Sequence, residues 1–325
     1  MATYKGIKGF KVESLASDPT AEDTIGKVWY NTTSNVLKYS AQGDGAWASG
    51  GTGNAARQAV AGAGTQTTAW IAGGEPIPVN DNYEQYNGTA WTQALVLNTG
   101  KDGRRAGGTQ TAGVVMGGFD MLETELWNGS TWTVVNPMPT KKNVGGSCGT
   151  STAALYVGGL PSPTQGSAVE EWNGTSWAEG TSVTTAKGYQ GSFGTSTASI
   201  QAGGNYPVFL TSAEEWNGTS WTEITSLPVA QTYLPASFGN TTDGIIAGGI
   251  GPPGFTIIGT TQKWNGTSWT TLSALASARR LLGGSTSATG GTSAGLAFFG
   301  SLPTITAISE EWDSPNYAAK TVTTS

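Results

Sequence analysis

Short apolar runs that end at glycine recur along most of this chain. Two clear examples are residues 69–72, with the sequence Ala-Trp-Ile-Ala, and residues 245–247, with the sequence Ile-Ile-Ala. Two glycines follow each of these runs directly. Runs this short, rich in β-branched and aromatic side chains and bounded by glycine, are typical of β-strands. The pattern therefore predicts an all-β protein built from many short strands.

A hexapeptide with an aromatic residue at each end follows every glycine pair, and its most frequent form is Trp-Asn-Gly-Thr-Ser-Trp. Copies begin at Tyr86, Trp127, Trp172, Trp216, Trp264 and, in a degenerate form that ends at Tyr317, at Trp312. Consecutive starting residues are 41, 45, 44, 48 and 48 positions apart. The preceding glycine pairs are Gly73-Gly74, Gly117-Gly118, Gly158-Gly159, Gly203-Gly204 and Gly248-Gly249, with Gly300-Ser301 in the last copy. Tandem repetition at this period indicates a repeat architecture.

Each repeat predicts four strands. The first strand begins near a basic residue, and the second ends at the glycine pair. The third ends in the first aromatic residue of the hexapeptide, and the fourth contains the second. The Asn-Gly sequence between them tolerates the positive φ angles of a tight hairpin turn. A turn of two residues and a turn of four are both open, and the choice decides whether the two aromatic residues face each other.

Four short strands in every repeat are typical of one blade of a β-propeller. The glycine pair and the paired aromatic residues, in five consecutive copies, make the chain resemble the kelch repeat family over about residues 52–325. This resemblance implies a kelch-like β-propeller. The sixth copy lacks one glycine and the Asn-Gly turn, so we expect a less regular hairpin there.

A weaker unit precedes the six repeats. Residues 27–30, 36–39 and 46–48 each read as a strand, and Tyr39 lies 47 positions before Tyr86. We interpret this unit as a first blade, which gives seven blades in total. The alternative is six blades with an N-terminal attachment hairpin. We divide the chain into an N-terminal segment, residues 1–50, and six kelch-like repeats, residues 51–325; no strand that would close the ring is evident.

The N-terminal segment is also similar to kelch-like structural proteins of marine tailed phages. The similarity rests on residues 4–10, 17–20, 26–31 and 46–51. It implies a virion component, for example in a tail fibre, with other virion proteins as partners and a homo-oligomer in the particle. The first residues lack the apolar run of a signal peptide, and no stretch is apolar enough for membrane insertion. A net charge of −6 argues against nucleic acid as a partner.

The sequence contains no histidine. His is the usual general base near neutral pH and a common metal ligand, so Ser-His-Asp and Cys-His catalysis are excluded. We therefore expect a non-enzymatic protein with no catalytic residues, no metal site and no cofactor. A glycosidase that uses only carboxylates stays open, because it needs just two acids at the right separation. The single cysteine, Cys148, lies among small residues and is expected to be a buried apolar side chain.

Charged residues recur at two positions of the repeat. Basic residues near the first strand are Arg57, Arg104, Arg105, Lys141, Lys142, Lys187, Arg279 and Arg280, with Gln231 in the remaining repeat. Acidic residues before the first aromatic residue include Glu84, Glu123, Glu125, Glu170, Glu171, Glu214, Glu215, Glu310 and Glu311. One interpretation is a ring of cations at the mouth of the channel that binds an anionic ligand such as an acidic glycan. Its candidates are Arg57, Arg104, Arg105, Lys142, Lys187 and Arg280. The other interpretation pairs each cation with a carboxylate of its own or a neighbouring blade.

The loops between the second and third strands differ in every repeat. Recognition loops are free to diverge, whereas packing fixes the scaffold positions. Exposed aromatic and apolar side chains on such loops indicate a contact surface. The candidates there are Asp81, Asp120, Tyr206, Phe209 and Phe255. We expect a virion structural protein whose variable loops contact a host-surface receptor or glycan, or another virion protein; a lectin-like glycan-binding propeller is the alternative, and a carboxylate glycosidase is a third hypothesis.

Overall fold

The computed structural model describes residues 12–19, 27–41, 45–78, 80–160, 166–205, 208–285, 291–314 and 318–322. These residues form β-strands, turns and loops and contain no helix. The chain divides into two compact units: unit 1 comprises Met1–Gly45 with Ser314–Ser325, and unit 2 comprises Ala46–Asp313. The sequence-based division after residue 50 therefore differs from this one at both ends of unit 2.

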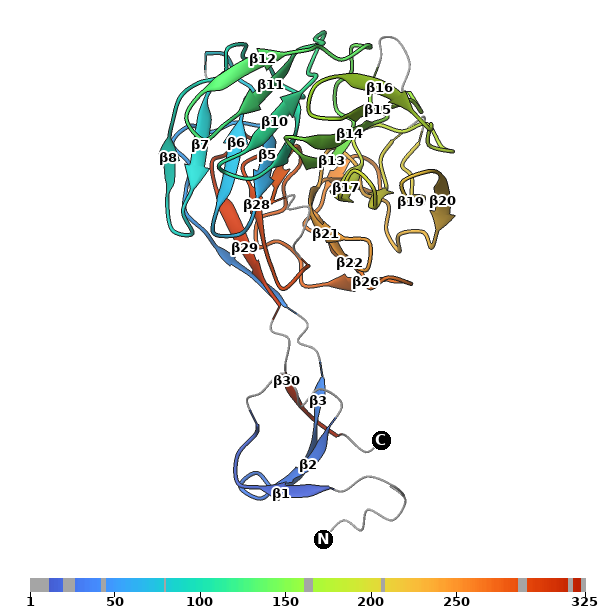
Figure 1. The fold of residues 1–325 in the computed structure, drawn as a ribbon. Helices are drawn as coiled ribbons and strands as arrows, with labels where there is room; N and C mark the ends of the chain where they lie inside the picture. The colour runs from blue at the N-terminus through green and yellow to red at the C-terminus, as the bar shows by residue number, and fades with distance from the viewer. Residues whose placement is uncertain are drawn as a thin grey trace. The chain divides into compact units, whose positions relative to one another are not determined.

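Unit 2 contains six four-stranded antiparallel sheets among its described residues, in a propeller-like arrangement (Figure 1). Sheet 1 comprises β5 (Ala61–Gly64), β6 (Ala69–Ala72), β7 (Tyr83–Tyr86) and β8 (Trp91–Gln93). Sheet 2 comprises β9 (Arg105–Gly108), β10 (Gly113–Met116), β11 (Thr124–Trp127) and β12 (Trp132–Val135). Sheet 3 comprises β13 (Gly146–Thr150), β14 (Ala153–Val157), β15 (Val169–Trp172) and β16 (Trp177–Gly180).

The remaining sheets of unit 2 follow the same order. Sheet 4 comprises β17 (Gly191–Gly194), β18 (Ser199–Ala202), β19 (Ala213–Trp216) and β20 (Trp221–Ile224). Sheet 5 comprises β21 (Ala236–Asn240), β22 (Asp243–Ala247), β25 (Thr261–Trp264) and β26 (Trp269–Leu272); β23 (Ile250–Gly251) and β24 (Thr256–Ile257) form a hairpin in its loop. Sheet 6 comprises β27 (Gly283–Gly284), β28 (Ala294–Phe298), β29 (Ser309–Asp313) and β4 (Ala46–Ser49).

The first strands of the six sheets contact one another in the cyclic order β5, β9, β13, β17, β21, β27 and back to β5. A circuit of backbone hydrogen bonds joins the sheets just before these strands. Its residues are Ala59, Gly103, Val144, Tyr189, Tyr233, Leu234 and Leu281, all with positive φ. Each sheet donates from a backbone N–H to a carbonyl of the sheet before it, for example Gly103 to Ala59 at 2.9 Å. Ala59 donates to Leu281 at 3.0 Å, which completes the circuit.

Apolar side chains between neighbouring sheets form the core of unit 2. Trp70, Tyr83 and Val115 pack together between sheets 1 and 2, for example, with Trp127 and Trp132 in the same cluster. In sheets 1 to 5 the two hexapeptide aromatic residues lie directly opposite each other on adjacent strands, as Trp127 and Trp132 do, with ring centroids 5.3 Å apart. Four residues lie between them, so the longer of the two open turns is the one formed.

The glycine pairs lie where each second strand leaves its sheet. Gly158 and Gly159 both have positive φ, and a Cβ on Gly158 would lie only 2.4 Å from the Lys187 carbonyl oxygen. In sheet 6 the equivalent residues are Phe299 and Gly300, with φ of 58° and 100°. The expected Gly300-Ser301 pair is thus displaced by one residue, and the first glycine of that repeat is replaced by Phe299.

The fourth strand of sheet 6 comes from the beginning of unit 2. Trp47 of β4 lies opposite Trp312 of β29, with ring centroids 5.3 Å apart. Trp47 therefore occupies the place that the second hexapeptide aromatic residue takes in the other sheets, and the expected partner Tyr317 lies outside the described residues. The prediction that residues 27–30, 36–39 and 46–48 form one blade is wrong, because the first two pair in unit 1 and the third pairs with β29.

The described residues of unit 1 form one sheet with the strand order β1 (Glu13–Leu15), β2 (Val28–Asn31), β3 (Val36–Ala41) and β30 (Ala318–Thr321). β1 is parallel to β2, and the other neighbours are antiparallel. Asp18 accepts hydrogen bonds from Lys38 and from the buried Trp29 and Asn31. The bond from Lys38 is the main reason why the pKa of Asp18 lies below its usual value.

Cys148 is buried in β13, and its thiol donates to the Thr195 carbonyl at 3.3 Å. Burial raises its pKa to about 12. Because the thiolate is the reactive form, we expect iodoacetamide at pH 8 to leave the native protein unmodified and to alkylate it once guanidinium has unfolded it. Intact-mass spectrometry distinguishes the two states, and rapid alkylation of the native protein would contradict this burial.

Candidate functional site

Five of the recurring cations form buried ion pairs within their own sheets. Each cation precedes or begins the first strand, and its carboxylate partner lies on the third. The pairs are Arg57–Glu84 at 2.6 Å, Arg104–Glu125 at 2.9 Å, Lys142–Glu170 at 3.7 Å, Lys187–Glu214 at 3.0 Å and Arg279–Glu310 at 2.8 Å. In all five pairs both side chains are buried.

Several cations of these ion pairs also donate hydrogen bonds to backbone carbonyls close to the glycine pairs. Arg57 donates from Nη1 to the carbonyls of Gly73 and Asn82, and Lys142 donates to the Ala168 carbonyl. Burial lowers the pKa of Lys142 and raises that of Glu170, since it penalises both charged forms. The accessible ring of cations, one of the two interpretations, is therefore not formed by Arg57, Arg104, Lys142 and Lys187. Each of these cations is neutralised by a carboxylate of its own sheet.

Sheet 5 has the same arrangement without charge. Gln231 replaces the cation and donates to the carbonyls of Gly248 and Thr260. Gln262 replaces the carboxylate and donates from its side-chain amide to the side-chain oxygen of Gln231. Two amides thus substitute together for a cation and its carboxylate, which indicates that this position has a structural role.

Arg105 and Arg280 differ from the other cations, because neither forms an ion pair or a side-chain hydrogen bond with the described residues. Arg105 follows the paired Arg104 directly, and Arg280 follows the paired Arg279. Successive residues of an extended chain point in opposite directions, so one side chain of each pair enters the sheet and the other turns away from it. Two of the six predicted cation sites therefore remain available.

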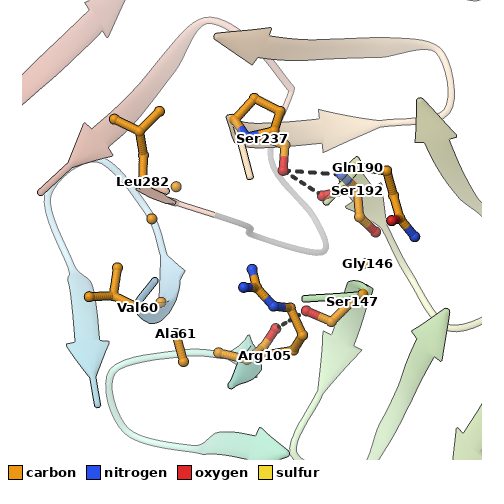
Figure 2. A pocket seen from close by; sticks show the side chains of 15 residues that line it. Val60, Ala61, Arg105, Gly146, Ser147, Gln190, Ser192, Ser237 and Leu282 are labelled. Carbon is orange, nitrogen blue, oxygen red and sulfur yellow. Dashed lines mark hydrogen bonds between the residues drawn. The ribbon is translucent and has the colours of Figure 1, made fainter. Parts of the chain in front are cut away.

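Arg105 lines a central cavity to which all six sheets contribute (Figure 2). Its guanidinium group points into this space, opposite Ser192 and Ser237 and beside Ser147. The cavity measures about 30 Å³, room for about one water molecule. Only a small polar group can enter it, so a larger ligand must lie mainly outside.

A cluster of aromatic side chains lies on the loop face, which consists of the loops between second and third strands together with the segments that lead into the first strands. Tyr189 and Tyr233 stack with centroids 4.7 Å apart, and Tyr233 meets the edge of Phe255 at 6.2 Å. Phe209 packs against Phe255 at 5.0 Å. Phe255 is 69% exposed, and the neighbouring Val208 is 63% exposed. Tyr206, which was also predicted for this face, lies outside the described residues.

A separate hollow of about 440 Å³ lies on the same face between sheets 2 and 3. It is lined by Phe119, Asp120, Thr140, Lys141, Lys142, Asn143 and Leu160. Asp120 accepts a hydrogen bond from Lys141 at 2.7 Å, which lowers the pKa of Asp120. The predicted site residue Asp120 therefore lies in a hollow of ligand size. Asp81 is partly exposed in the loop of sheet 1 and does not line this hollow.

Sequence reasoning did not single out Tyr189 and Tyr233. Each lies two residues after the recurring basic position, in the sequences Lys187-Gly188-Tyr189 and Gln231-Thr232-Tyr233. That shared offset was the available signal, because residues at one offset in different repeats lie at equivalent places around the mouth of the cavity.

No known protein family matches this chain, and no curated protein is significantly similar to it in sequence. In the part of the chain that the structure describes, no group of three or more Cys, Asp or Glu side chains is arranged to hold a metal ion. The same residues include no helix that is long and apolar enough to cross a membrane.

Proposed function

We propose that this chain is a non-enzymatic virion structural protein, built on a six-bladed kelch-like propeller, whose loop face contacts a host surface or a neighbouring virion protein. Six blades are supported by the six sheets of unit 2, the cyclic contacts of their first strands and the backbone hydrogen bonds that connect sheet 6 with sheet 1. In this proposal β4 closes the ring as the outer strand of the sixth blade.

One observation carries the assignment of the contact surface. The side chains that repeat in every sheet are buried and bonded to one another, whereas large apolar side chains on the loop face are exposed. Ile77, Phe119, Val208 and Phe255 each lie in a different loop between second and third strands. Exposed apolar side chains gathered on one face of a protein are typical of an interaction surface.

The non-enzymatic assignment is supported by the carboxylates of the third strands. Glu84, Glu125, Glu170, Glu214 and Glu310 are held by buried cations, so they are not free to act as a catalytic acid and base at one substrate. The virion setting rests on the resemblance of the N-terminal segment to structural proteins of tailed phages.

Replacing Phe255 by alanine tests this proposal. We expect the purified protein to bind its particle or host cells at least tenfold more weakly, because exposed aromatic side chains often dominate an interface, while the melting temperature changes little. Val134→Ala is the matched control, since Val134 is half exposed but lies on the outer strand β12. A sedimentation binding assay measures both variants, and equal losses for the two, or none for Phe255→Ala, would remove the loop face as the contact surface.

A glycan-binding, lectin-like propeller is the second candidate function. The hollow at Phe119 and Asp120 favours it, because it combines an exposed aromatic ring, a carboxylate and a volume suited to a small ligand.

A further inference from the structure

Most cations of unit 2 are neutralised by a carboxylate. Three are not: Lys101, Arg105 and Arg280. All Asp and Glu residues of unit 2 belong to the described residues, and none of them forms an ion pair with Arg105 or Arg280. The other three arginines of unit 2 are all paired with a carboxylate, whereas Arg105 and Arg280 are available to bind a ligand.

Arg105 is the more unusual of the two. Its Nε and Nη2 atoms are buried and make no hydrogen bond, although its guanidinium group points into the central cavity (Figure 2). Arg105 as a whole is only partly buried, but unsatisfied buried polar atoms such as these two are rare in native structures. An anionic group of a ligand at the cavity mouth would satisfy both atoms.

Arg280 and the two tyrosines extend this site onto the loop face. The Arg280 guanidinium lies over the ring of Tyr233, 6.0 Å from its centroid, and Tyr233 stacks on Tyr189. Tyr189 directly precedes Gln190, which lines the cavity, and burial is the main reason why the pKa of Tyr189 is raised. The four side chains Arg105, Tyr189, Tyr233 and Arg280 are named the mouth cluster here.

We propose that the mouth cluster binds a carboxylate-bearing sugar, such as a uronic acid residue of an acidic polysaccharide. Guanidinium groups bind carboxylates through paired hydrogen bonds, and the cavity admits only a small group, so the carboxylate enters while the sugar ring stays outside. Its hydroxyl groups then meet the tyrosines. This site would give the loop face its specificity for one class of ligand. The inference therefore rests on the proposed function, in which the loop face is the contact surface.

A sugar fits this cluster better than an acidic peptide does. Aromatic rings next to cations bind the C–H face of a pyranose, and the unpaired Oε1 of the channel-lining Gln190 offers an additional buried acceptor for a hydroxyl group. A peptide carboxylate would use the arginines but leave these groups without a partner.

Calorimetric titration of the full-length protein tests the assignment. The probes are tetrasaccharides of galacturonate, of mannuronate and guluronate, and of hyaluronan, together with their neutral methyl esters, a tetraglutamate peptide and potassium phosphate. We expect at least one acidic tetrasaccharide to bind, its methyl ester to bind at least tenfold more weakly, and Arg105→Gln and Arg280→Gln each to weaken binding about tenfold. Lys263→Gln is the control, because it removes one positive charge that lies on β25 and pairs with Asp243.

Several outcomes would overturn the proposal: no acidic tetrasaccharide binds, the methyl esters bind equally well, tetraglutamate or phosphate binds as tightly as the sugars, or Arg105→Gln has no effect. Thermal melts separate loss of binding from loss of folding, because Arg105→Gln removes an unpaired charge and should leave the melting temperature equal or higher. If Phe255→Ala abolishes attachment while no sugar binds, the sugar assignment fails and the contact surface stands. If instead a sugar binds and Phe255→Ala leaves attachment unchanged, the contact surface at Phe255 is wrong and the sugar assignment stands.

Discussion

Arg57→Gln is expected to lower the free energy of unfolding by about 3–5 kcal/mol, the usual cost when one partner of a buried ion pair is removed. The substitution leaves the Glu84 carboxylate fully buried with no cation beside it, and it also removes the hydrogen bonds from Arg57 to the carbonyls of Gly73 and Asn82. Equilibrium unfolding in guanidinium chloride, monitored by tryptophan fluorescence, measures the change.

The double variant Arg57→Gln/Glu84→Gln is the decisive partner of that experiment. Sheet 5 already contains this combination as Gln231 and Gln262, whose side-chain amides form the equivalent hydrogen bonds. We therefore expect the double variant to recover most of the stability that Arg57→Gln loses, so that the two substitutions couple strongly in a double-mutant cycle. Additive losses would mean that Arg57 and Glu84 do not stabilise the fold as a pair, and Arg57 would again be a candidate ligand-binding residue.

Removing β4 is expected to have an effect of similar size. Two truncated chains make the comparison: residues 46–313, which retain all of unit 2, and residues 51–313, which lack β4. Without β4 the buried Trp312 loses its neighbour Trp47, and β29 becomes an unpaired edge. Exposure of one large, fully buried apolar side chain costs about 1.5–3 kcal/mol, and the backbone pairing of β4 with β29 is lost as well.

Differential scanning calorimetry of the two truncated chains provides the readout. The chain 46–313 should melt as one cooperative transition, and the chain 51–313 should melt at a clearly lower temperature or aggregate, because exposed strand edges pair with other chains. Equal melting temperatures would show that β4 is dispensable and would contradict the proposed six-bladed closed ring.

Local sequence patterns were sufficient to predict much of this fold. The glycine pairs mark positions where a Cβ would collide with a carbonyl, and Asn-Gly marks the hairpin turns, so both recur for steric reasons that sequence displays directly. The apolar runs before the glycine pairs correctly predicted the second strands, such as β6 and β22.

The closing strand could not be predicted in the same way. Residues 46–48 were assigned to the strands next to them in the sequence, but β4 pairs with β29 near the other end of unit 2. Pairing between distant segments leaves no local pattern. The available signal was Trp47 itself, a tryptophan shortly before the first repeat in a chain whose last repeat lacks a tryptophan at the end of its hexapeptide.

The candidate site shows the same limit at the level of single residues. Arg104 and Arg105 are chemically identical neighbours, yet one is buried against Glu125 and the other points into the central cavity. Composition and spacing place both arginines near the central cavity, whereas the direction of each side chain depends on where β9 begins. The sequence therefore located the cations but not which of them are free.

A cryo-EM map of the intact virion would show directly whether the loop face of this chain is a contact surface. We expect the chain to be present in the virion and its loop face, marked by Phe119, Phe209 and Phe255, to be either presented outward or in contact with another virion protein. The opposite face, with its Asn-Gly turns, should be free of specific contacts. A particle without this chain, or a map in which the turn face makes the contacts and the loop face is covered by nothing and directed inward, would contradict it.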